Sequence, residues 1–133
     1  MMLAATGRAR DINDHRTARR RRERRGRLAE IVAAAVLVLK GYRILSRRHR
    51  GPVGEVDLIA VRGRRLAFVE VKFRASLQAA QASITSRQAR RVRAAAEHWV
   101  WRHPRYREHE IGVDALLLGP GFLPRFVPHA LQK

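Results

Sequence analysis

Residues 65–74, RLAFVEVKFR, form a run typical of a buried β-strand, yet this run contains a glutamate and a lysine two positions apart. Side chains alternate across a strand, so the odd-numbered positions from 67 to 73 share an apolar face, while Glu70, Lys72 and Arg74 share the opposite face. Residues two apart on a strand are separated by about 6–7 Å. The segment therefore predicts a carboxylate and an ammonium group that can act on one reacting centre.

The preceding segment, GEVDLIA (residues 54–60), reads as the first strand of a hairpin and supplies a second acid. A tight basic turn between the two strands would place Asp57 diagonally beside Glu70, so that two carboxylates and the amine of Lys72 converge. Two carboxylates within about 4 Å repel each other unless a proton or a cation lies between them. We therefore predict a site for Mg²⁺ (or Mn²⁺), which binds carboxylate and phosphate oxygens and promotes phosphodiester hydrolysis. In such a site Lys72 would orient the attacking water or stabilise charge in the transition state.

Hydrophobic periodicity predicts a first helix over Arg27–Lys40. Its core face is predicted to consist of Leu28, Ile31, Val32, Ala35 and Leu39. Glu30 lies on the other side of this helix, beside alanines and a leucine one and two turns on, so we expect its carboxylate to lie against protein.

The remaining elements complete an α/β pattern. Strands are predicted at Tyr42–Leu45, 53–61, Leu66–Phe73 and Ile111–Leu118, with a basic turn at 47–52 and a loop at 75–83. A second long helix, capped by Thr85 or Ser86, runs to about Trp101. Its core face is predicted to consist of Ala89, Val92, Ala96, Trp99 and Val100. The order αβββαβ predicts an α/β fold of three layers, α/β/α, in which a central mixed sheet is flanked by helices.

The charge balance indicates a polyanionic partner. The chain has 29 Lys and Arg residues against 11 Asp and Glu residues, which gives a net charge of +18, and only three of the basic residues are lysines. We expect this partner to be a nucleic acid, with DNA the first choice. A GC-rich genome would also favour arginine over lysine, so part of the charge can be without function.

Several classes of protein are excluded by what the sequence lacks. The absence of cysteine excludes a disulfide framework, a cysteine nucleophile and a thiolate zinc site. No secretory signal is recognisable. The longest wholly apolar run, Ile31–Leu39, has nine residues, against the roughly 20 that span a bilayer. We therefore expect a cytoplasmic protein without a membrane partner.

The chain resembles PD-(D/E)XK nucleases in their core motif, because Asp57 is followed, after a gap of 12 residues, by Glu70, Val71 and Lys72. The longer words GEVDLIA and FVEVKFR more specifically resemble the YraN-type family of predicted endonucleases, over residues 26–118. The resemblance also includes Gly26, Glu30 and the segment GYRIL, which all precede GEVDLIA in the chain.

This resemblance implies a restriction-endonuclease-like fold, related to that of archaeal Holliday junction resolvases. It also implies that Asp57, Glu70 and the carbonyl of Val71 bind the metal ion. Lys72 would be the catalytic lysine, and Glu30 would hold a metal-bound water or a second ion.

The chain departs from the family pattern at two places. Gln88 stands where a lysine usually opens the second long helix, and Gly112, Val113 and Asp114 stand where the family has Arg-Phe-Asp. We expect Asp114 to cap a backbone group or to pair with an arginine. Contacts with nucleic acid are predicted for Arg74, Arg87, Gln88 and Arg91. Trp101, on the helix side away from the core, would stack on a base or lie between two copies of the chain, which leaves a homodimer open.

Residues 26–121 are predicted to form a nuclease-like domain, preceded by a disordered basic arm (1–25) and followed by a C-terminal edge strand or tail (122–133). The primary hypothesis is a metal-dependent endonuclease acting on DNA, including branched or single-stranded forms. A nucleic-acid-binding module that keeps the nuclease fold without cutting remains an alternative, as does an RNA-structural protein. Glu70 and Lys72 would then be an ion pair on a solvated face, which contributes little energy. The six histidines show no metal-ligand spacing and are expected at the surface.

Overall fold

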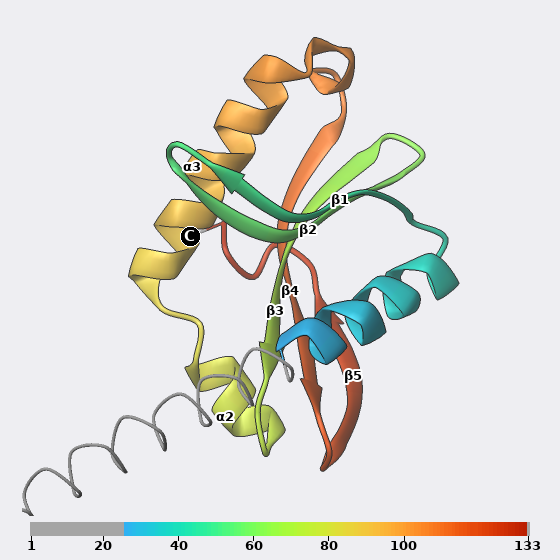
Figure 1. Ribbon diagram of the computed structural model, residues 1–133, viewed down its shortest axis with the longest axis vertical. Helices are drawn as coiled ribbons and strands as arrows, with labels where there is room; N and C mark the ends of the chain where they lie inside the picture. Colours follow the sequence, from blue (N-terminus) through green and yellow to red (C-terminus); the bar gives the residue numbers. More distant parts are fainter. Residues whose placement is uncertain (1–25, 133) are drawn as a thin grey trace, which may run out of the picture.

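The computed structural model describes residues 26–132, so the predicted basic arm at residues 1–25 lies outside the described residues. Its centre is one five-stranded sheet in which the strands follow one another in sequence order (Figure 1). The strands are β1 (Arg43–Gly51), β2 (Gly54–Arg62), β3 (Arg65–Phe73), β4 (Glu110–Gly119) and β5 (Phe122–Val127). The β3–β4 pair is parallel and the other three pairs are antiparallel, so the sheet is mixed, as predicted.

A parallel pair of adjacent strands requires a crossover, because the chain must return to the starting end of the sheet. Helices α2 (Leu77–Ala82) and α3 (Ser86–Arg102), followed by the short 3₁₀ helix η1 (Pro104–Tyr106), supply this crossover. Helix α3 begins as predicted, because the hydroxyl of Thr85 accepts a hydrogen bond from the backbone N–H of Gln88 at 3.2 Å. Helix α2 was not predicted and occupies most of the segment expected to be a loop.

Helices cover both faces of the sheet, which confirms the predicted three-layer α/β/α arrangement (Figure 1). On one face α3 packs against the sheet, and its buried residues are Ala89, Val92, Ala95, Ala96 and Trp99. On the other face the helix of residues 26–39 packs against β2, β3 and β4. The side chains of Phe68 and Val69, neighbours on β3, therefore belong to different cores.

The first helix buries a different face from the one that was predicted. The predicted core residues Leu28, Ile31, Val32, Ala35 and Leu39 are exposed. Ala29, Ala33 and Leu37 are buried instead, against Leu58 and Val69. Both sides of this helix are apolar, and the small alanines allow its backbone to approach the sheet closely, so side-chain size selects the buried face. Within residues 26–132 there is no helix with the length and hydrophobicity that crossing a bilayer would demand.

Strand β1 is longer than predicted. Residues 47–51, expected to form a turn, belong to β1, and the chain turns at Pro52 and Val53. Gly54 then starts β2 directly against α3, where a Cβ atom would lie 2.4 Å from the carbonyl oxygen of Arg91. The hairpin of β1 and β2 can therefore lie this close to α3 only with glycine at position 54. At the opposite edge of the sheet, residues 122–127 form β5.

Candidate active site

Asp57 lies where β2 and β3 separate. The two strands pair from Leu58 and Val69 to the hairpin turn, but no pair precedes Leu58. At this point the carboxylate of Asp57 accepts a hydrogen bond from the backbone N–H of Val71 at 2.7 Å. The side chain thus takes the place of a strand partner, and this contact turns Asp57 toward β3.

Glu70 and Lys72 lie on the face of β3 that α3 covers, and both are nearly buried, with 9 % and 6 % of their surface exposed. The amine of Lys72 lies 3.4 Å from Oε1 of Glu70. The same oxygen accepts a hydrogen bond from Nε2 of Gln88 at 2.9 Å. An ion pair on a solvated face is therefore the wrong description of Glu70 and Lys72, because protein surrounds both groups.

The two acids predicted to converge do interact directly. Burial, and then the charge of Asp57, raises the pKa of Glu70 to about 7, although Lys72 opposes this shift. Burial also raises the pKa of Asp57, against the hydrogen bond from Val71, and the charge of Glu30 adds to the rise. The proximity of the two carboxyl groups also lowers the pKa of Asp57 and raises that of Glu70. At neutral pH this pair therefore favours a shared proton or a bound cation over two free charges.

The stability of the metal-free protein is expected to fall between about pH 4.5 and pH 7. The pKa of Glu70 is about 7 in the folded chain, above its ordinary value of 4.5. The protonated carboxyl therefore stabilises the fold fully below pH 4.5, and this stabilisation is lost as the pH rises to about 7. The loss is up to about 3 kcal/mol, since each pH unit corresponds to about 1.4 kcal/mol. Urea unfolding of wild type and Glu70→Gln across this range measures it. Parallel pH profiles for the two proteins would contradict the prediction, and Glu55→Gln, an exposed carboxylate on β2, is the matched control.

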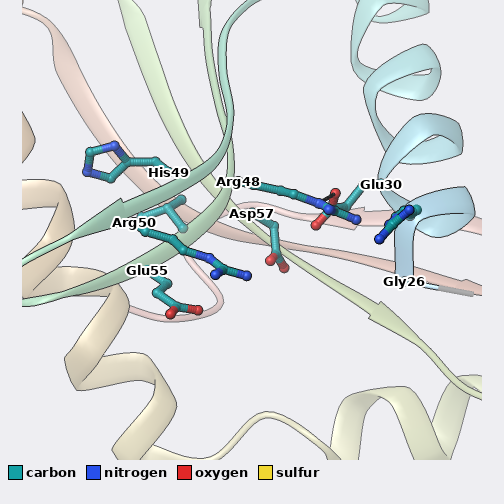
Figure 2. A pocket seen from close by; sticks show the side chains of 9 residues that line it. Gly26, Glu30, Arg48, His49, Arg50, Glu55 and Asp57 are labelled. Atoms are coloured by element: carbon teal, nitrogen blue, oxygen red, sulfur yellow. Dashed lines mark hydrogen bonds and ion pairs between the residues drawn. The ribbon is translucent and has the colours of Figure 1, made fainter. Parts of the chain in front are cut away.

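Glu30 faces Asp57 across a hollow of about 330 Å³. Figure 2 shows Asp57 between Glu30 and Arg48 on one side and Arg50 and Glu55 on the other. Glu30 pairs with the guanidinium of Arg48, so the carboxylate lies against protein as predicted. Arg48 lies in β1 between the residues that pair with Leu58 and Val56. Its φ is positive, 54°, a conformation that arginine rarely adopts outside functional or strained positions.

A second hollow, of about 360 Å³, adjoins the first, and Glu30 and Asp57 line both. Val71, Phe73 and Arg74 form its other walls. Glu70 and Lys72 line neither hollow. Asp57 is therefore the member of the buried cluster that a ligand in either hollow would meet first.

The donor set around Asp57 fits a hard divalent cation that keeps several waters. Within residues 26–132 no three His, Asp, Glu or Cys side chains come close enough to hold a metal ion by themselves. Asp57, Glu70 and the carbonyl of Val71 would be the protein ligands. Mg²⁺ is usually bound in this way, by one or two carboxylates together with water and substrate phosphate oxygens. The repulsion between the half-buried carboxylate of Asp57 and the buried one of Glu70 supports a cation here on electrostatic grounds.

The residues predicted to contact nucleic acid lie at two places. Arg74 lines the second hollow, whereas Arg87 and Arg91 are exposed on the first two turns of α3. Gln88, on the same turns, points to Glu70 instead of to solvent. Arg48 and Arg50 were not singled out from the sequence. Their position in a basic run read as a turn concealed that they form a strand beside Asp57.

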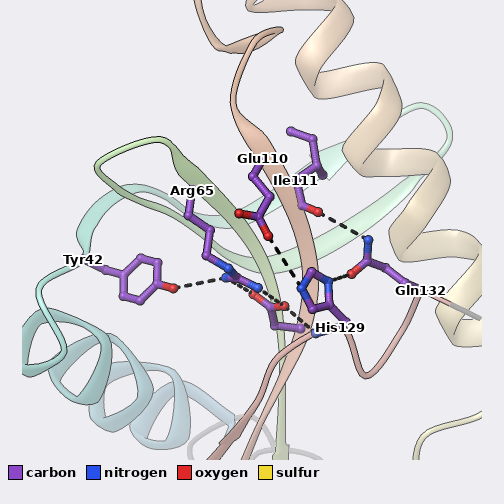
Figure 3. Close-up of polar contacts among 7 residues, drawn as sticks. Tyr42, Arg65, Glu110, Ile111, His129 and Gln132 are labelled. Carbon is purple, nitrogen blue, oxygen red and sulfur yellow. Dashed lines mark hydrogen bonds and ion pairs between the residues drawn. The ribbon is translucent and has the colours of Figure 1, made fainter.

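A separate ion pair lies on the far face of the sheet, and its arginine, Arg65, was not identified from the sequence. Asp114 on β4 is fully buried, and both of its oxygens accept hydrogen bonds from Arg65, at 2.7 and 2.8 Å. Figure 3 shows Arg65 also reaching the hydroxyl of Tyr42. Asp114 pairs with an arginine, which was one of the two roles expected for it. Gly112 makes room for that arginine, since a Cβ there would lie 2.3 Å from the guanidinium.

Comparison with known proteins gives a consistent result. A family model described as "Uncharacterised protein family UPF0102" matches residues 29–118, a range that includes Glu30, Asp57, Glu70 and Lys72. A UPF0102 protein of Rhodopseudomonas palustris (strain BisB18) is 49 % identical over 109 residues, covering 82 % of this chain and 81 % of that protein. A UPF0102 protein of Bradyrhizobium diazoefficiens is 50 % identical over 104 residues, or 78 % of each chain. A UPF0102 protein of Nitrobacter winogradskyi is 49 % identical over 100 residues, covering 75 % of this chain and 85 % of that protein.

Proposed function

Since this chain belongs to the uncharacterised protein family UPF0102, we propose a function from the geometry of its buried acids: a metal-dependent endonuclease that hydrolyses phosphodiester bonds in DNA in the cytoplasm. One observation carries this proposal. Asp57 and Glu70 interact directly beside Lys72. Burying an ion pair with an extra carboxylate is costly for stability, and apolar residues of similar size would often serve a fold at least as well. A chemical role explains why these charges are there.

Each residue of the cluster has a distinct task in this mechanism. Asp57 and Glu70, together with the carbonyl of Val71, would hold a Mg²⁺ or Mn²⁺ ion. When bound, such an ion supplies Lewis-acid polarisation of the phosphoryl oxygens and lowers the pKa of a water molecule. The amine of Lys72, 3.4 Å from Glu70, stabilises the negative charge that grows on the phosphate during attack. Glu30, on the opposite wall of the hollow, orients the water.

Positive charge around the two hollows supports a polyanionic substrate. Arg48 and Arg50 line the first hollow, and Arg74 lines the second. Together with the net charge of +18, these groups provide affinity that does not depend on base sequence. The described residues thus suit backbone recognition, and the resemblance to resolvase-type nucleases favours branched or single-stranded DNA. A homodimer is part of this proposal, because a branched substrate presents two strands to be cut.

One feature favours a second candidate, a nucleic-acid-binding module that retains the nuclease fold. Gln88 occupies one oxygen of Glu70, and Lys72 is only 6 % exposed. A substrate phosphate could reach this lysine only if Gln88 or the neighbouring side chains moved. The module would bind DNA through its arginines without cutting it.

A cleavage assay separates the two candidates. The purified full chain is incubated with branched, single-stranded and duplex DNA in Mg²⁺, in Mn²⁺ or in EDTA. The endonuclease is expected to cut at least one substrate in either metal, and chelation is expected to remove cutting because the two acids alone cannot polarise a phosphate. DNA binding by the same preparation, with no product in any metal on any substrate, would select the module instead.

A further inference from the structure

A third hollow, of about 210 Å³, lies between the end of β1 and the C-terminal half of α3. Three histidines and two arginines line it: His49, Arg50, His98, Arg102 and His103. Its other lining residues are uncharged, so no carboxylate among its walls balances these groups. His49 is far in the sequence from His98 and His103, and the fold brings the three together. All six histidines were expected at the surface; of these three, His103 is exposed as predicted, whereas His49 and His98 are half-buried.

His49 carries the strongest sign of a missing ligand partner. Its Nε2 atom is buried and has no hydrogen-bond partner within the described residues. Burial lowers the pKa of His49, and the charges of His103, His98 and Arg102 lower it further. A bound anion would supply the missing hydrogen-bond partner of Nε2 and would offset the positive charge around His49.

His103 presents a ring of fixed orientation to the same hollow. Its Nδ1 lies 2.7 Å from the backbone oxygen of Trp99. A carbonyl oxygen only accepts, so Nδ1 carries a proton and donates it to Trp99, which leaves Nε2 as the ring nitrogen that can contact a ligand. The ring also stacks on the indole of Trp99, with centroids 3.9 Å apart. This double attachment holds the imidazole in place before any ligand arrives.

The chemistry of this histidine hollow selects an anion over a metal ion. Within residues 26–132 the histidines form no group that could hold a metal. Two guanidinium groups beside them would also repel a cation. Arginine with protonated histidine instead offers charge-assisted hydrogen bonds to phosphate oxygens.

We propose that the histidine hollow binds a backbone phosphate of the nucleic acid, next to the phosphate that lies at Asp57. His49 and Arg50 line both this hollow and the one at Asp57. His49 pairs across the ladder with Val56, the neighbour of Asp57 on β2. One polynucleotide strand can therefore contact both places. The choice of nucleic acid as the source of the phosphate rests on the proposed function.

The first test uses NMR of the histidine rings in the full chain at about pH 6.5, where imidazole titrates. Inorganic phosphate and a short single-stranded oligodeoxynucleotide are titrated separately, against sodium chloride of equal ionic strength. We expect both ligands to shift the signals of His49, His98 and His103, and to bind more tightly as pH falls from 8 to 6. The charged groups that line the hollow beside these rings are Arg50 on β1 and Arg102 on α3, while Glu55 lies opposite Arg50 in the β1–β2 ladder and outside the hollow. The signals of His129, which contacts Glu110 and Gln132, serve as the internal reference.

The second test compares Arg102→Gln with Arg107→Gln, an exposed arginine beyond η1 that does not line the hollow. Oligonucleotide affinity is measured at several salt concentrations. The slope of log K against log salt is negative, and loss of one phosphate contact reduces its magnitude by about 0.7 for single strands. We expect this decrease in Arg102→Gln and an unchanged slope in Arg107→Gln.

The outcomes separate this proposal from the proposed function. Unshifted histidine signals with both ligands, or equal slopes for the two variants, overturn the phosphate site even if the protein cuts DNA. Shifts with inorganic phosphate alone overturn nucleic acid as its ligand. Shifts with the oligonucleotide, together with no cutting in Mg²⁺ or Mn²⁺, support the phosphate site and leave the endonuclease contradicted.

Discussion

Asp57→Asn is expected to lower the rate of metal-dependent DNA cleavage by about 10³-fold or more, because loss of a charged metal ligand removes several kcal/mol of transition-state stabilisation. The asparagine oxygen can still accept the hydrogen bond from Val71 that Asp57 accepts at 2.7 Å. The substitution also removes a buried charge beside Glu70. The variant should therefore fold as stably as wild type, or more stably, in the absence of metal, and bind DNA with similar affinity. Single-turnover cleavage, thermal unfolding and DNA binding together measure these expectations.

Glu55→Gln is the matched control for this experiment. Glu55 lies on the same strand and lines the same hollow as Asp57, but its side chain is exposed. Neutralising it changes the local charge equally and should leave cleavage within about twofold, as expected for a surface charge. Equal rates for Asp57→Asn and wild type would mean that the cutting activity resides elsewhere.

Asp114→Ala is expected to cost about 3–5 kcal/mol of unfolding free energy, because it removes the buried carboxylate that holds the half-buried guanidinium of Arg65. Asp114 is fully buried and holds Arg65 with two hydrogen bonds, at 2.7 and 2.8 Å. It also accepts a hydrogen bond from the backbone N–H of His129 at 2.8 Å, which ties the C-terminal segment to β4. The measurement is urea unfolding monitored by circular dichroism, with far-UV spectra to verify the fold.

Two further variants make this stability test specific. Asp114→Asn keeps an acceptor for the backbone N–H of His129 but not the negative charge. It should therefore lose less unfolding free energy than Asp114→Ala. Glu110→Ala removes an exposed carboxylate from the same strand, 3.8 Å from His129, and should change stability by less than about 0.5 kcal/mol. A loss in Asp114→Ala no larger than that of Glu110→Ala would show that the buried pair contributes nothing beyond a surface contact.

The sequence was most informative where strand periodicity decides the outcome. Alternation along β3 places Phe68, Glu70 and Lys72 on one face, as predicted, and the structure shows that α3 covers this face. The meeting of Asp57 with Glu70 followed from the hairpin, whose geometry is local. Along β2, strict alternation fails beside Asp57. Val56 packs with α3 whereas Leu58 packs with the first helix, so β2 twists between them.

Contacts between distant segments could not be predicted. Residues 49, 98 and 103 share a hollow only because β1 lies beside α3, and no local pattern encodes that proximity. The pairing of Arg65 with Asp114 depends in the same way on the parallel register of β3 and β4. The first helix misled the prediction for a different reason. Large apolar residues lie on its exposed side, and only the tertiary contact shows that Ala29 and Ala33 form the buried one.

The crossover between β3 and β4 has a consequence for the order in which the protein folds. Asp57 and Glu70 are joined by a hairpin and can approach each other as soon as it forms, on a timescale of microseconds. Gln88 reaches Glu70 only after α3 has docked, and the parallel strand pair closes a much longer loop, which slows folding. The desolvation of the acids therefore belongs to a late step. A cation present in the refolding buffer would act at this late step. It would favour the state in which α3 is docked over an open hairpin whose carboxylates are still hydrated.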